Sequence, residues 1–155
     1  MKSLAVFISL FLLSCGQSKK HAESQPQDVR NAIAVLEAGT VSRIEYYYLP
    51  ESILTRSALT PDRLVANAPY RATLETPPRA NLVEIADGLA GSTYTPMENP
   101  GDIRLGVEFY GDSGQKFLSI FFDQSGTRAT INSDVFVVKG AVREILRRRI
   151  RCLAE

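Results

Sequence analysis

The sequence predicts a single α+β domain in which helices pack on one face of a mostly antiparallel β-sheet. Three features of its 155 residues support this fold class. Several segments carry apolar residues at helical spacing, others alternate apolar and polar residues as strands do, and short turn sequences join the strands of the C-terminal half. Because short connections favour antiparallel hairpins over parallel crossovers, we expect a C-terminal β-meander.

The first half of the domain is expected to alternate helices and strands. The elements are, in order, a helix over 28–38, a strand over 41–49, a short helix over 61–66, a strand over 70–75 and a helix between Pro78 and Gly91. In the first helix, apolar residues recur at i, i+3, i+4 and i+7 from Val29. Thr60-Pro61-Asp62 starts the short helix with an N-cap hydroxyl, a proline at the first position and an acid in the first turn.

The second half is expected to be a loop, a meander and a final helix. The segments are a loop over 92–102, strands over 103–110, 116–122, 127–131 and 135–138, and a helix over 141–153. The first of these strands alternates strictly from Ile103, and the turn sequences "GDSG" (111–114) and "DQSG" (123–126) join successive strands. The last helix turns Val142 and Ile150 inward.

The first 14 residues have the pattern of a secretory signal peptide. Lys2 gives a charged start, and the apolar run from Leu4 to Leu13 is about ten residues long. Such a run is too short to cross roughly 30 Å of hydrocarbon as a helix. Since Ser14 is a small residue that suits the position before a peptidase cut, we expect residues 1–14 to be removed.

The segment Leu12-Leu13-Ser14-Cys15 resembles the lipobox of bacterial lipoproteins, in which an apolar, a second and a small residue precede an invariant cysteine. The resemblance implies that Cys15 becomes the N-terminus and carries several acyl chains, which anchor a protein stably where one chain does not. It places the protein in the bacterial envelope. In a Gram-negative source, Gly16 after the cysteine implies an outer-membrane anchor facing the periplasm. An ordinary signal peptide, cut near Ser14 or Gly16 without lipidation, is the alternative.

Residues 15–27 are expected to be a flexible tether, and the folded domain is expected to span residues 28–155. The tether has no large apolar side chain, so it cannot offset the entropy cost of becoming ordered. The remaining chain is long enough for one domain with its own core.

Charge and cysteine content bear on the partners. The formal net charge is +1 and falls to about zero without Lys2, so no overall positive field favours nucleic acid.

The two cysteines are Cys15 and Cys152. With Cys15 lipidated, Cys152 has no partner within the chain. We expect a buried, inert thiol there, with an intermolecular disulfide or a reactive thiol as alternatives.

The residue types argue against an enzyme and against a bound metal or cofactor. His21, the only histidine, lies in the predicted tether, which cannot hold a catalytic or metal-binding group within about half an ångström of its working position. This argues against Ser-His-Asp and Cys-His pairs and against His-bound zinc. Carboxylates such as Glu108 and Asp123 belong to no recognisable motif, and the Asp-containing turns lack the acidic spacing of a calcium loop. We therefore expect no catalytic residue, no metal ligand and no cofactor.

Two groups of side chains are expected to contact a partner. Arg143, Arg147 and Arg151 recur at i, i+4 and i+8 on the final helix, where they suit an anionic partner. The alternative is a solvated helix face, stabilised by the helix dipole and by pairing of Glu144 with Arg148.

The second group consists of two tyrosines. Alternation places Tyr46 on the core face of its strand, so Tyr47 and Tyr110 are expected to project from the other face of the sheet. A helix packed on that face would bury them.

We expect a non-catalytic lipoprotein that is held at the membrane and binds another envelope component, either a protein or peptidoglycan. In general layout the domain resembles small envelope lipoproteins of unassigned function. One alternative is an immunity or inhibitor lipoprotein that neutralises a toxin or hydrolase, with the loop over 92–102 as its contact. A further alternative is a carboxylate-based enzyme acting on peptidoglycan, which a deep acidic cleft would favour.

Overall fold

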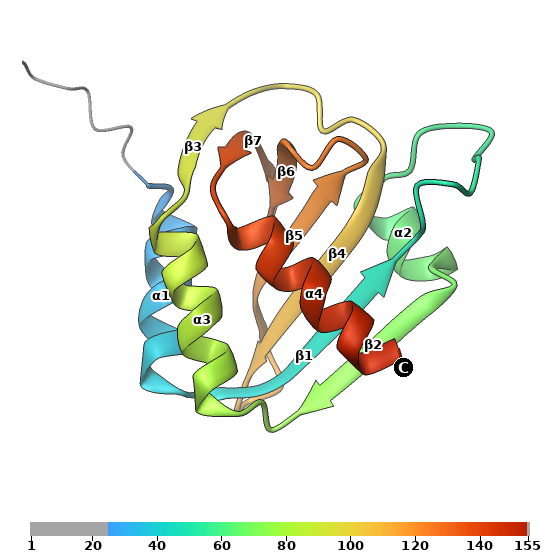
Figure 1. Ribbon diagram of the computed structural model, residues 1–155. Coiled ribbons are helices and arrows are strands. Elements are labelled where there is room, and N and C mark those ends of the chain that lie inside the picture. Colours follow the sequence, from blue (N-terminus) through green and yellow to red (C-terminus); the bar gives the residue numbers. More distant parts are fainter. Residues whose placement is uncertain (1–24, 155) are drawn as a thin grey trace, which may run out of the picture.

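The computed structural model describes the backbone of residues 25–154 and the side chains of residues 25–151. Within this range the elements are α1 (Gln27–Ala38), β1 (Val41–Tyr48), α2 (Pro61–Asn67), β2 (Tyr70–Glu75), α3 (Arg79–Ala90), β3 (Thr93–Pro96), β4 (Ile103–Gly111), β5 (Lys116–Asp123), β6 (Arg128–Ile131), β7 (Asp134–Lys139) and α4 (Val142–Ala154). The predicted α+β class is confirmed (Figure 1).

The seven strands of the described range form one sheet in the order β2-β1-β4-β5-β6-β7-β3, and all six pairings are antiparallel. The strands β4, β5 and β6 each pair with the next strand along the chain, so the predicted meander is present. The strands β1 and β3 join this meander from its two sides, through pairing with β4 and β7 respectively. The edges of the sheet are therefore β2 and β3.

Three helices cover one face of the sheet. In Figure 1, α1 and α3 lie side by side and α4 crosses the sheet in front of β1 and β4. Their buried side chains, including Leu36, Leu89 and Leu146, pack against strand residues such as Tyr46 and Phe109. This is the main core, and it follows from the period-two alternation of the strands, which turns their large apolar residues to one face.

The short helix α2 lies on the opposite face of the sheet, which departs from the predicted one-sided packing of helices. Its Leu64 is completely buried in a second, smaller cluster that includes Tyr47, Ile103 and Phe121. The physical reason is that Tyr47 of β1, Ile103 of β4 and Phe121 of β5 place apolar surface on this face, and α2 supplies the cover that buries it.

The strand β3 forms inside the segment predicted to be a loop. It is four residues long, pairs with β7 and buries Tyr94, whose hydroxyl donates a hydrogen bond of 2.9 Å to the carbonyl oxygen of Leu89. Pro96 ends the strand at an edge of the sheet, where a missing N–H costs no ladder hydrogen bond.

The predicted signal peptide (1–14), the lipidation site Cys15 and most of the predicted tether lie outside the described residues. The last tether residues are structured, because Gln25 donates hydrogen bonds to the end of α3 and Gln27 begins α1. Cys152 is in α4, but its side chain lies outside the described range. Between residues 25 and 154, no helix combines the length and apolar character needed to span a membrane.

Candidate functional site

The face of the sheet that carries α2 also presents a row of polar side chains. Alternation along β1 turns Arg43, Glu45 and Tyr47 away from the main core, and the register with β4 sets Glu45 directly opposite Glu108. Two carboxylates directly opposite each other in a sheet repel, so their neighbours must supply compensation.

Two tyrosine hydroxyls lie between these carboxylates. Tyr47 donates a hydrogen bond of 2.5 Å to Oε2 of Glu45, and Tyr110 donates one of 2.9 Å to Oε2 of Glu108. Each hydroxyl is also near the other carboxylate, at 3.3 Å and 3.4 Å. The four side chains therefore form one hydrogen-bonded unit, which we call the tyrosine–glutamate cluster.

Two cations complete the balance of charge. Arg43 Nε lies 2.9 Å from Oε1 of Glu45, and its guanidinium stacks 4.1 Å from the centre of the Tyr110 ring. Lys116 Nζ lies 2.7 Å from Oε1 of Glu108. Two positive charges thus match two negative charges, and the cations compensate the repulsion between the glutamates.

The hydroxyls of the cluster are held in their neutral, donating form. Burial raises the pKa of Tyr110 to about 12, with further contributions from its hydrogen bond to Glu108 and from the charges of both glutamates. Burial and the hydrogen bond to Glu45 raise the pKa of Tyr47 well above its ordinary value. Both phenols therefore keep their protons at physiological pH.

The prediction that Tyr47 is available to a partner is wrong. Tyr47 faces away from the main core, as alternation predicts, but only 6% of its surface is exposed because α2 covers it. Tyr110 is half-buried, and its hydroxyl is bonded within the cluster. The tyrosine most open to solvent is Tyr70 on the edge strand β2, at 48% exposure. The sequence does not predict the exposure of Tyr70, because β2 is an edge strand only through the order of strands in the sheet.

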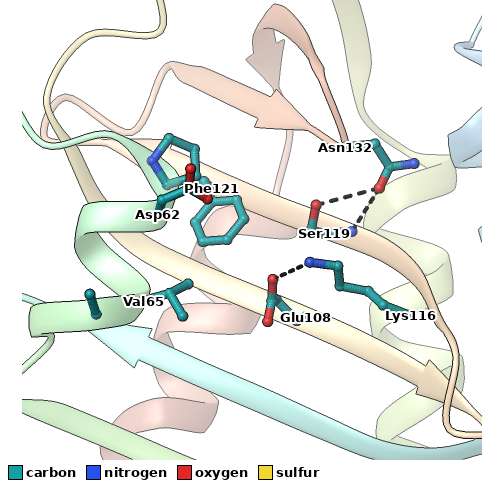
Figure 2. A pocket seen from close by; sticks show the side chains of 9 residues that line it. Asp62, Val65, Glu108, Lys116, Ser119, Phe121 and Asn132 are labelled. Carbon is teal, nitrogen blue, oxygen red and sulfur yellow. Dashed lines mark hydrogen bonds and ion pairs between the residues drawn. The ribbon is translucent and has the colours of Figure 1, made fainter.

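A hollow of about 400 Å³ lies between α2 and the sheet, next to the cluster (Figure 2). One wall is apolar and includes Val65 and Phe121, while the other carries Glu108, Lys116 and Ser119. These polar groups are largely bonded to one another or to nearby residues. Lys116 binds Glu108, and both the amide and the hydroxyl of Ser119 donate to the side-chain oxygen of Asn132. The hollow can admit a small molecule, but Glu108, Lys116 and Ser119 in its wall already bind neighbouring side chains.

The arginines of α4 differ in how far they are engaged. Arg143 and Arg147 lie 3.2 Å and 3.6 Å from Oε1 of Glu51 in the loop after β1. Arg148 does not pair with Glu144 as predicted, because Glu84 of α3 is nearer to it across the contact between the two helices.

The two remaining arginines of α4 differ from each other. Arg149 also binds Glu84, whereas Arg151 is exposed and makes no ion pair with any residue in the described range. The buried Nε–H groups of Arg143, Arg147 and Arg149 have no acceptor among the described residues.

The outer face of α4 is hollowed into a groove that we call the arginine groove. Its volume is about 270 Å³, and it is lined by Glu144, Arg147, Arg148 and Arg151. Three guanidinium groups therefore face one carboxylate in the same depression. Guanidinium groups bind carboxylates and phosphates in a bidentate manner, so the groove is chemically suited to an anionic group.

Comparisons with known protein families, with curated proteins and with solved structures found no match. The described residues also contain no group of three or more His, Cys, Asp or Glu side chains placed to hold a metal ion.

Proposed function

We propose that this chain is a lipid-anchored protein of the bacterial envelope whose domain binds an anionic partner through the arginine groove, without catalysing a reaction. The anchor would be Cys15, supported by the lipobox pattern of residues 12–15. The partner would be an envelope component with exposed carboxylates or phosphates, such as an acidic protein surface or peptidoglycan.

The observation that carries this proposal is the unequal engagement of the α4 arginines. Five arginines lie along the helix, and three glutamates of the described range (Glu51, Glu84 and Glu144) pair with them, which leaves an excess of positive charge within that range. By contrast, the tyrosine–glutamate cluster is balanced in charge. A surface with spare guanidinium donors has more to gain from an anion than one whose polar groups already bind each other.

The role of the groove is tested with two substitutions that each replace an exposed cation by glutamate, one inside the groove and one outside it. Arg151→Glu removes the arginine that is unpaired in the described range, and Lys139→Glu, at the end of β7, is the matched control. Chemical crosslinking in intact envelopes is expected to recover a partner with the wild type and with Lys139→Glu but not with Arg151→Glu. Equal recovery by both variants would contradict a role for the groove.

The anchor is tested separately. Cells fed an alkyne-bearing fatty acid are expected to label the wild-type chain, and Cys15→Ala is expected to abolish that label and to release the protein from the membrane fraction. A Cys15→Ala chain that fractionates with the membrane as the wild type does would contradict the proposed anchor.

A further inference from the structure

The edge strand β2 leaves one side of its backbone without a neighbouring strand in the described part of the chain (Figure 1). It is six residues long, and its pairing with β1 runs without a bulge from Tyr70 to Glu75. The opposite edge strand, β3, is only four residues long and ends at Pro96. Proteins commonly protect sheet edges by short strands, prolines and bulges. The edge at β3 has two of these features, whereas the edge at β2 has no proline and no bulge and is longer.

The hydrogen bonding of β2 to β1 fixes which backbone groups point outward. The N–H of Thr76, just after β2, donates a hydrogen bond of 2.8 Å to the carbonyl oxygen of Ser42 in β1. In an antiparallel pair, one residue directs both its N–H and its C=O to one side, and the next residue directs both to the other side. Alternation back from Thr76 therefore turns the backbone groups of Arg71, Thr73 and Glu75 away from β1. These three residues are also exposed.

The side chains near the two ends of this edge carry opposite charges. Arg71 is held at the end of α2, where it donates a hydrogen bond of 2.7 Å to the carbonyl oxygen of Ala66. Glu75 lies opposite Arg43 in the register, but Arg43 pairs with Glu45. Neither Arg71 nor Glu75 forms an ion pair within the described range, and about 13 Å of extended strand separates them from each other. The edge therefore presents one unpaired cation and one unpaired anion.

This edge is complementary to a second copy of itself. When two β2 strands are set antiparallel about a two-fold axis at Thr73, Arg71 of each copy lies opposite Glu75 of the other. These are the residues with outward backbone groups, so the two edges join through about six backbone hydrogen bonds. Opposite charges that face each other across two strands stabilise the pairing, and a shift of two residues in either direction breaks both charge pairs. On the other face, the ring of Tyr70, 48% exposed, comes within diagonal reach of Leu74 of the second copy.

We infer that β2 is a self-association site, through which two copies of this chain join their sheets edge to edge. The interface is isologous, because the same strand contributes from both copies. The inference goes beyond the proposed function and does not depend on the lipid anchor or on the arginine groove. The two-fold axis is perpendicular to the joined sheet, so α4 of both copies lies on the same side of it. A dimer therefore carries two arginine grooves on one side, and two linked sites hold a partner that reaches both more tightly than one site does.

Disulfide trapping tests the pairing. In a hydrogen-bonded antiparallel pair, the Cα atoms of opposite residues lie about 5.5 Å apart, a separation that a disulfide spans. Thr73→Cys places two thiols at the two-fold axis, and Thr93→Cys makes the same substitution at an exposed position of the other edge. Both are made in the full chain with Cys152→Ser, which removes a competing thiol. The chain is purified in detergent and oxidised with copper phenanthroline, and non-reducing gels measure the disulfide-linked dimer.

A change of charge tests the register. Glu75→Arg sets like charges opposite each other in both pairs, and Glu98→Arg makes the same change at an exposed position after β3. In the Thr73→Cys chain, we expect Glu75→Arg to lower the yield of dimer about tenfold and Glu98→Arg to leave it unchanged. Circular dichroism checks that both charge variants are folded.

We expect a disulfide-linked dimer from Thr73→Cys, and from Thr93→Cys no more dimer than the Cys152→Ser chain forms alone. Equal yields from Thr73→Cys and Thr93→Cys would overturn the inference, and so would a dimer whose yield is the same with Glu75→Arg as with Glu98→Arg. Absence of the Thr73→Cys dimer also overturns it, whether β2 stays open or residues 1–24 cover it.

Discussion

The close approach of β4 and β5 at Gly106 gives a sharp test of the face that carries α2. A methyl group built on Gly106 lies 2.5 Å from Cε1 of Phe121 and 3.3 Å from Cδ2 of Leu64, whereas ordinary contacts begin at about 3.4 Å. The ring of Phe121 therefore has to move by roughly 1 Å, and it is only 3% exposed. Overpacking of this kind costs about 1–3 kcal/mol.

The expected loss for Gly106→Ala is smaller than that full cost. Replacing glycine reduces the conformational freedom of the unfolded chain and returns about 0.4–1 kcal/mol. We therefore expect a net loss of about 1–2 kcal/mol in the free energy of unfolding, measured by urea denaturation followed by circular dichroism. The variant is also expected to alter the hollow beside α2, because Phe121 forms part of its wall.

Gly111 in the same strand provides the control. A methyl group at Gly111 meets nothing closer than the carbonyl oxygen of Thr40, at 3.8 Å, and Gly111 has no positive φ. Gly111→Ala is therefore expected to leave the free energy of unfolding unchanged or slightly higher. If Gly106→Ala and Gly111→Ala unfold at the same urea concentration, the packing of Phe121 over Gly106 is not as described.

Three further predictions concern burial and charge. Leu64→Ala is expected to cost about 3 kcal/mol, because it empties the completely buried contact of α2 with the sheet, and urea unfolding measures the loss. Arg104→Leu leaves Asp102 without its cation and is expected to lower the free energy of unfolding by about 3 kcal/mol. It should also speed tryptic cleavage after Arg56 in the loop that Arg104 holds. Unchanged cleavage would count against a loop fixed by Arg104. Burial raises the pKa of Tyr46 from 10.0 to about 12. The contribution of this raised pKa to the free energy of unfolding is complete below pH 10. It is lost between about pH 10 and 12, where the phenol of the unfolded chain releases a proton that the folded protein keeps. Tyr46→Phe should remove up to about 3 kcal/mol of that alkaline loss, seen by comparing urea unfolding below pH 10 and near pH 12.

Most backbone elements could be predicted because each carries its own local signal. The strand expected over 70–75 has those bounds, and Thr60-Pro61 sets the start of α2 where the cap pattern places it. The strand β3 could not be predicted, since it is four residues long and its single buried side chain, Tyr94, cannot establish an alternation.

The contacts of the candidate site depend on tertiary structure, and local pattern says little about them. Alternation predicts which way Tyr47 points, but its burial depends on α2 folding back over the sheet through Leu64. The same holds for Arg148, whose partner Glu84 is 64 residues away in the sequence. The hydrogen bonds from Arg104 to the loop after β1 likewise span about fifty residues and leave no periodic trace.

The position of β1 inside the sheet has a consequence for how the chain acquires its structure. β1 obtains its inner neighbour only when β4, which begins at Ile103, has been synthesised. Until then β1 and β2 form at most a two-stranded ribbon, which is marginal in water, and α1 and α3 have no sheet on which to bury their apolar sides. Folding is therefore delayed until the central hairpin of β4 and β5 appears. The core can therefore close only after β5, which ends at Asp123, has also been synthesised.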